Sequence, residues 1–171
     1  KNPGKANLVI DLSASWLGSA GLLAIGATNR PYSIPGTVNY FGDPRFNQPD
    51  GILGNGSRSF LLVSSPRAIE EGLDLDGGDN GILEELPAGT TLLDSIAWSD
   101  GSTNDVLYGP ALNLSNGLSD AALRLPARNT PNTAEGWVFG DLLGETPGSL
   151  DFDPERDSDD FPLGTPLTPA R

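Results

Sequence analysis

The densest group of side chains able to do chemistry in this sequence lies between Asp74 and Glu85, where carboxylates alternate with glycines. Calcium takes roughly six to eight hard oxygen ligands, usually from a compact and flexible loop. Carboxylates at alternate positions supply such oxygens, and the glycines permit a sharp turn. The predicted ligands are Asp74, Asp76, Asp79, Asn80, Glu84 and Glu85. The alternative for the same residues is a solvated Asp/Gly turn without an ion.

A second acidic run covers Asp151–Asp160 and is interrupted by Pro154. Its alternating charges suit an extended segment, which is either a solvated end of the domain or a second cation site. The Asp74–Glu85 loop does not have the ligand spacing of an EF-hand. Calcium is therefore the cofactor that we expect, with its site at Asp74–Glu85.

Aromatic side chains offer a second kind of site, because exposed rings can stack on sugars. In a β-sandwich such rings more often belong to the core. Trp98 lies inside an apolar cluster, which favours the core, whereas Tyr40 follows a Pro- and Gly-rich segment and is the better candidate for exposure. The residues considered for a sugar platform are Trp16, Trp98, Trp137, Tyr32, Tyr40 and Tyr108.

Composition removes several classes of function. The chain has no Cys and no His, which excludes Ser-His-Asp and Cys-His catalysis and Cys-ligated metals. Only a hydrolase with paired carboxylates stays open, and we expect no enzyme. The net charge of −13 argues against nucleic acid as a partner and against an anionic membrane surface, since both attract Lys and Arg. No apolar run approaches the ~20 residues that span a bilayer, so no membrane insertion is expected.

The elements that must position these residues are short. Apolar clusters of a few residues alternate with Gly, Pro, Asn and Ser, which is typical of strands joined by turns. The clusters lie at residues 7–12, 21–26, 59–64, 92–98, 106–108, 122–125 and 137–139. They predict an all-β chain, an immunoglobulin-like β-sandwich of about seven or more short strands with long loops. Residues 60–63 are apolar on both faces and predict a central strand. Residues 92–98 have mixed faces and predict a strand that is either near a sheet edge or covered by a loop. Ser65–Gly72 predicts one helical turn.

Several segments together resemble the bacterial lamin-tail-like domains, an immunoglobulin-like sandwich family of secreted and surface proteins. The Leu-Asp-Ser-Ile-Ala-Trp strand and the Asp-Phe-Pro-Leu-Gly-Thr-Pro-Leu-Thr-Pro ending carry most of this resemblance, which covers about residues 5–169. The segments are Gly56–Val63, Leu92–Gly101, Leu118–Arg124, Asp157–Phe161 and Thr165–Pro169. The resemblance implies a non-catalytic module and transfers no catalytic residues.

We therefore expect one lamin-tail-like domain over residues 1–171, with a Pro-rich, linker-like end at 162–171. Such domains open with strands upstream of the segment that matches Leu8–Ile10. We expect those strands either to be missing here or to be supplied by another chain, which would leave an exposed sheet edge. The predicted function is that of a non-catalytic structural or interaction module, calcium-stabilised, at the cell surface or outside the cell. It would act with a protein partner or by self-assembly, and the alternative is a carbohydrate-binding module.

Overall fold

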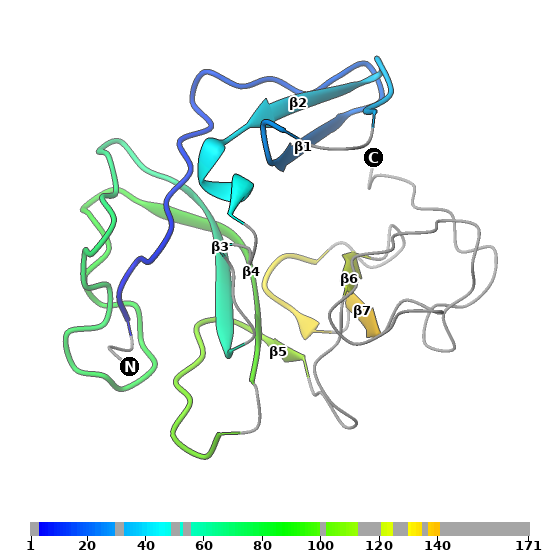
Figure 1. The fold of residues 1–171 in the computed structure, drawn as a ribbon. Helices are drawn as coiled ribbons and strands as arrows, with labels where there is room; N and C mark the ends of the chain where they lie inside the picture. Colours follow the sequence, from blue (N-terminus) through cyan, green and yellow to red (C-terminus); the bar gives the residue numbers. More distant parts are fainter. Residues whose placement is uncertain are drawn as a thin grey trace. The chain divides into compact units, whose positions relative to one another are not determined.

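The computed structural model describes residues 4–29, 33–48, 52, 56–99, 102–112, 121–124, 130–134 and 137–140. Regular structure in these residues consists of seven strands and one short 3-10 helix (Figure 1). The short apolar clusters between turn residues explain why strands rather than helices form. The mainly-β class expected from the sequence is confirmed.

The chain divides into two compact units. The smaller unit covers Ile10–Asn55 and contains β1 (Leu22–Gly26) and β2 (Val38–Gly42), which pair in parallel. The 3-10 helix η1 (Pro44–Asn47) follows β2 directly. A parallel pair needs a crossover between its strands, and the residues after Gly26 supply it.

The larger unit is formed by the N-terminal residues up to Val9 and by the chain from Gly56 onward. Its main sheet has the order β3 (Arg58–Ser64), β4 (Thr91–Trp98) and β5 (Ala111–Leu112). β3 and β4 are antiparallel, and β4 and β5 are parallel. A separate antiparallel pair consists of β6 (Ala121–Arg124) and β7 (Trp137–Gly140) (Figure 1).

The order of the main sheet reverses one expectation. β4 lies between β3 and β5, so the strand with mixed faces is not at an edge. β3, whose residues 60–63 are apolar on both faces, is at the end of the described sheet. Three other expectations are wrong. Residues 106–108, which were expected to form a strand, form none. Residues 7–12 form no strand, and Ser65–Gly72 forms bends and a turn, in which the Ser65 hydroxyl bonds both the N–H and the C=O of Arg67. Those local bonds compete with a helix.

Part of the core of the larger unit lies on the face of β3 and β4 that Tyr108 covers. Ala97 and Ser95 in β4 are buried and pair with Ser59 and Leu61 of β3. Tyr108 covers this face, where its backbone N–H donates to the Ser59 hydroxyl at 2.9 Å. Because side chains alternate across a strand, Phe60 and Leu62 must lie on the opposite face.

On that opposite face, Phe60 stacks on Trp98 with ring centroids 5.0 Å apart. Ile96, which pairs with Phe60, is buried, whereas Phe60 and Leu62 are exposed. The outer face of the sheet therefore carries an apolar strip that the described residues cover only in part. In the described part of the chain, no helix has the length and apolar character needed to cross a membrane.

Candidate functional site

The Asp74–Glu85 loop begins on a short backbone ladder with the N-terminal segment. Ala6 N–H donates to the carbonyl of Leu73, and Leu75 N–H donates to the carbonyl of Gly4. Lys5 and Asp74 form an isolated antiparallel bridge between these bonds. The far end of the loop returns to the same place, because Glu85 N–H donates to the Leu75 carbonyl at 3.1 Å. The loop is thus closed at its base by backbone bonds.

The side chain of Asp76 is the centre of the loop. Asp76 is fully buried, with 0% of its surface exposed. Its Oδ1 accepts from Asn80 N–H at 3.1 Å, and its Oδ2 accepts from Gly81 N–H and from the Tyr108 hydroxyl, each at 2.8 Å. A buried carboxylate is tolerated only where donors of this kind compensate for lost hydration. Asp76 therefore joins its own loop to the core face of the sheet.

The electrostatics of this pair follow from the same contacts. Burial opposes ionisation of Asp76, but the N–H groups of Asn80 and Gly81 and the Tyr108 hydroxyl outweigh it, so its pKa lies below the ordinary value. Burial and the neighbouring Asp76 carboxylate raise the pKa of Tyr108. Tyr108 consequently stays protonated and donates, while Asp76 stays ionised and accepts.

The outer part of the loop is held by a second set of bonds. The side chain of Asn80 accepts from Ile82 N–H and donates to Glu84 Oε1, both at 2.8 Å. Glu85 reaches over the loop glycines, since a Cβ on Gly77 would lie 3.4 Å from its Oε1. These side chains are exposed, so the loop presents its remaining charge to solvent.

The six residues expected to bind calcium thus have different positions. Asp76 is inside, Asp74 is half-buried with its Oδ1 bonded to Asp76 N–H, and the other four are exposed. Within the described residues, no three His, Cys, Asp or Glu side chains converge as a ligand set. The oxygen donors suit calcium in kind.

Sequence reasoning missed two residues of this site, Gly4 and Tyr108. Gly4 has a φ of +82°, and a Cβ on it would lie 2.9 Å from the Asp76 Cβ. Tyr108 is 32 residues from Asp76 along the chain. The apolar cluster at residues 106–108 predicted a strand and gave no sign of a polar bond. For Gly4 the sequence did offer a signal, because it belongs to a Pro-Gly pair at positions 3 and 4 and such pairs mark turns.

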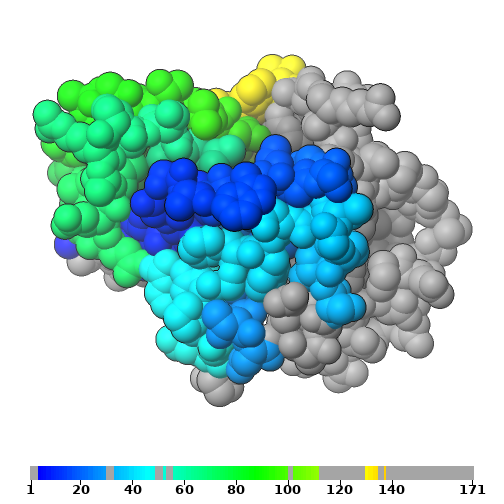
Figure 2. Space-filling model, turned by 90° about the horizontal axis from the view of Figure 1, so that it is seen from above, coloured from blue at the N-terminus to red at the C-terminus, as the bar shows by residue number. Residues whose placement is uncertain are grey.

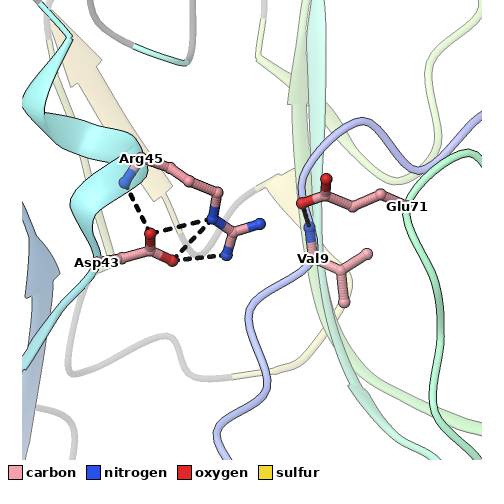
Figure 3. A network of polar contacts seen from close by, with 4 residues as sticks. All are labelled: Val9, Asp43, Arg45 and Glu71. Atoms are coloured by element: carbon pink, nitrogen blue, oxygen red, sulfur yellow. Dashed lines mark hydrogen bonds and ion pairs between the residues drawn. The ribbon is translucent and has the colours of Figure 1, made fainter.

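In the smaller unit, Asp43 begins η1 and also binds Arg45. Its carboxylate accepts from the Arg45 backbone N–H at 2.9 Å and from the Arg45 guanidinium through Nε at 3.0 Å (Figure 3). The Arg45 side-chain bond is the main reason that the pKa of Asp43 is lowered. Hydrogen bonds between a guanidinium and a carboxylate are charge-assisted and stronger than neutral ones.

Figure 3 also shows a contact within the larger unit, where Val9 N–H donates to Glu71 Oε1 at 3.2 Å. It extends the attachment of the N-terminal segment beyond the ladder at Ala6. A general acid in a paired-carboxylate hydrolase needs a raised pKa. The pKa values of Asp11, Asp43 and Asp76 are all lowered, which makes these three unsuited to that role.

The aromatic residues considered for a sugar platform differ in their exposure and contacts. Tyr108 is buried, Trp98 is stacked on Phe60, and Tyr40 is half-buried with its hydroxyl on the Ala27 carbonyl. Trp16 is 71% exposed, and its carbonyl accepts from the Asn39 side chain at 2.7 Å. The blue N-terminal part of the chain is open to the viewer in Figure 2. Tyr32, the run 151–160 and the end 162–171 lie outside the described residues.

Comparison with protein-family models, with curated proteins and with solved structures found no match to this chain. The lamin-tail-like resemblance therefore stays a prediction from the residues that carry it.

Proposed function

We propose that this chain is a non-catalytic structural or interaction module of a secreted or cell-surface protein. We further propose an immunoglobulin-like sandwich in which calcium stabilises the Asp74–Glu85 loop. The observation that carries this proposal is the buried Asp76, whose carboxylate holds the loop together through bonds to two loop N–H groups and to the Tyr108 hydroxyl. A loop built in this way supports a rigid surface rather than a reacting group.

The exposed rim of the same loop supports the calcium part of the proposal. Asp79, Asn80, Glu84 and Glu85 are all exposed and close in sequence, and the loop base is fixed. An ion that binds the folded loop but not the unfolded chain stabilises the fold by mass action. At a calcium concentration tenfold above the dissociation constant, this corresponds to about 1.4 kcal/mol. For a chain of this length it would raise the melting temperature by roughly 3–6 °C.

The test is thermal melting of the full chain in EDTA, in millimolar calcium and in millimolar magnesium. The wild type should gain melting temperature in calcium, and the double variant Glu84→Gln with Glu85→Gln should lose that gain. The variant Glu70→Gln is the matched control, since Glu70 is exposed and lies outside the loop. If calcium changes the melting temperature of neither the wild type nor Asp74→Ala, the calcium part of the proposal is ruled out.

One observation favours a second candidate function, carbohydrate binding. Trp16 presents most of its ring to solvent and its backbone is fixed by Asn39, as a sugar-stacking residue requires. Affinity electrophoresis against soluble polysaccharides would test it. Retardation of the wild type that Trp16→Ala abolishes and Leu17→Ala preserves would favour this function, because Leu17 is the exposed neighbour without a ring.

A further inference from the structure

Strand β3 is the last strand of the three-stranded sheet, and β4 is its only strand partner among the described residues. It is seven residues long and regular. The register jumps from Leu62 opposite Asp94 to Val63 opposite Leu92, so the extra residue of the bulge, Leu93, is in β4. The outer edge of β3 therefore keeps an uninterrupted backbone.

β3 also lacks the features that normally protect an edge strand. Proteins block such edges with Lys, Pro, bulges or inward-pointing charges. Between Arg58 and Ser64 there is no Pro and no Lys, and Arg58 at the first position is the only charge. Phe60 is 36% exposed and Leu62 is 50% exposed, both on the outer face. A strand of this kind is suited to pairing with another strand.

We propose that the outer edge of β3 docks β3 of a second copy of this chain, antiparallel and centred on Leu61. This deepens the proposed function, on which it rests, by naming the partner of the interaction module. A two-fold axis at Leu61 places Phe60 of each copy opposite Leu62 of the other. An aromatic ring opposite an aliphatic side chain is a favourable cross-strand pair, and each covers apolar surface of the other.

Charge decides the direction of pairing. A parallel arrangement in register would set the two Arg58 side chains against each other, and like charges directly opposite are destabilising. The antiparallel arrangement puts Arg58 opposite Ser64, which is neutral. No other charged residue lies on the strand, so this register has no repulsive pair.

The same observations make the association weak. A contact of one seven-residue strand is small beside the roughly 1,200–2,000 Å² that stable interfaces bury. Each copy also carries a net charge of −13, and that repulsion is screened by salt. The dimer should therefore form at high protein concentration and strengthen as ionic strength rises.

Sedimentation equilibrium of the full chain, at low and high salt, measures this directly. The wild-type mass should rise with concentration toward that of two chains, and Leu62→Lys should weaken association at least about tenfold, since two like charges then flank the two-fold axis. Leu93→Lys is the matched control, because Leu93 is 45% exposed but belongs to β4. A wild type that stays monomeric, or a control that dissociates equally, would overturn the proposal.

Disulfide trapping tests the register. The chain has no Cys, so no native thiol competes with an introduced cysteine for disulfide formation. Leu61→Cys should cross-link, because directly opposite residues lie roughly 4.5–5.5 Å apart between Cα atoms, within disulfide range. Phe60→Cys should not, since it faces Leu62, and the reverse pattern would contradict the proposed axis. Circular dichroism melting confirms that each variant is folded.

Alternate β3 amides already bond to β4, so the informative amides are those that point away from it. A monomeric wild type in which these outward-pointing amides are protected from hydrogen exchange would mean that the chain's own residues occupy the edge. That result would also overturn the dimer. It would leave the proposed module function standing, because the calcium melting test does not depend on association.

Discussion

The Asp74–Glu85 loop and strand β3 belong to the same unit but distribute polarity in opposite ways. The loop buries a charged carboxylate, whereas β3 leaves a phenylalanine and a leucine exposed. Buried charges and exposed large apolar groups are the informative exceptions to ordinary burial. In the loop, N–H and O–H donors from the same unit bind the buried carboxylate, so the unit itself compensates for the burial of this charge. In β3 the described residues leave the side chains of Phe60 and Leu62 partly uncovered, and the proposed β3–β3 pairing would cover them.

This contrast gives each region a different sensitivity. A change at Asp76 removes bonds that hold the folded unit together, and its cost appears as lost stability. A change on the outer face of β3 touches few residues of the same unit, so its cost appears in association. Measuring both quantities on the same variants separates the two regions.

The largest effect is expected for Asp76→Asn. The amide replaces one acceptor oxygen with an N–H₂ donor, which then faces donors from Asn80, Gly81 or Tyr108. Leaving buried donors unpaired should lower the melting temperature by roughly 5–10 °C at neutral pH. Asp79→Asn is the matched control in the same loop, and it should shift the melting temperature by no more than about 1–2 °C because Asp79 is exposed. Equal losses for the two would remove the distinction between the inside and the rim of the loop.

The pH dependence of the same variant sharpens this test. A carboxylate with a lowered folded pKa stabilises the fold above its ordinary value, near 3.8, and loses that contribution as pH falls through the folded value. The difference in stability between wild type and Asp76→Asn should therefore be constant near neutrality and shrink below about pH 4. Urea unfolding of both proteins between pH 3 and pH 7 measures it. Taking the difference cancels the parallel contributions of Asp11 and Asp43, whose pKa values are lowered too.

Gly4→Ala should rank next. The methyl group would meet the Asp76 Cβ at 2.9 Å, and the positive φ adds backbone strain, so we expect a loss of about 1–3 kcal/mol. Gly72→Ala is the matched control, since its φ of +86° is similar and no atom lies within 4 Å of the added Cβ. Comparing the free energies of unfolding of the two variants by chemical denaturation separates the cost of backbone strain from the cost of steric overlap with Asp76. A control that loses as much as Gly4→Ala would show that the N-terminal segment does not press against the loop.

Tyr108→Phe should cost about 1–2 kcal/mol, because Asp76 loses one of its donors while the ring still fills its place. Its raised pKa means that the hydroxyl stabilises the fold below the ordinary value of 10.0, and that this contribution falls as pH rises above it. Wild type and Tyr108→Phe should therefore converge in stability above pH 10. Denaturant unfolding at pH 8 and at pH 10–11 checks the convergence, and a gap that widens with pH would contradict the Asp76–Tyr108 bond.

Sequence reasoning reached the loop and the strand class but not how they are joined. The Asp/Gly pattern located the loop at residues 74–85, and the apolar clusters located β1, β3 and β4. It could not find the Asp76–Tyr108 bond, because nothing in local spacing links residues 32 positions apart. For the same reason it placed Asp76 among the ligands beside Asp74, whereas burial separates Asp76 from the exposed rim.

The reversed places of β3 and β4 have a related cause. A strand that is apolar on both faces usually predicts a central position, since two buried faces need apolar side chains. Here the core face of β3 packs under Tyr108, and its outer face keeps Phe60 and Leu62 exposed. An apolar pattern predicts that a strand face is buried, but it does not say which residues, of the same chain or of another, bury it. β2 at Val38–Gly42 was missed because the Pro and Gly residues around it predicted a loop.

The smallest effect on stability is expected for Leu62→Thr. Half of the Leu62 side chain is already exposed, and threonine suits a strand, so the monomer should lose no more than about 0.5–1 kcal/mol. Its self-association should weaken severalfold, because the aliphatic partner of Phe60 is lost. Leu93→Thr should change folding by a similar amount and leave association intact. If Leu62→Thr instead lowered monomer stability more than Tyr108→Phe, the outer face of β3 would be part of the folded core, and the two regions would not differ in kind.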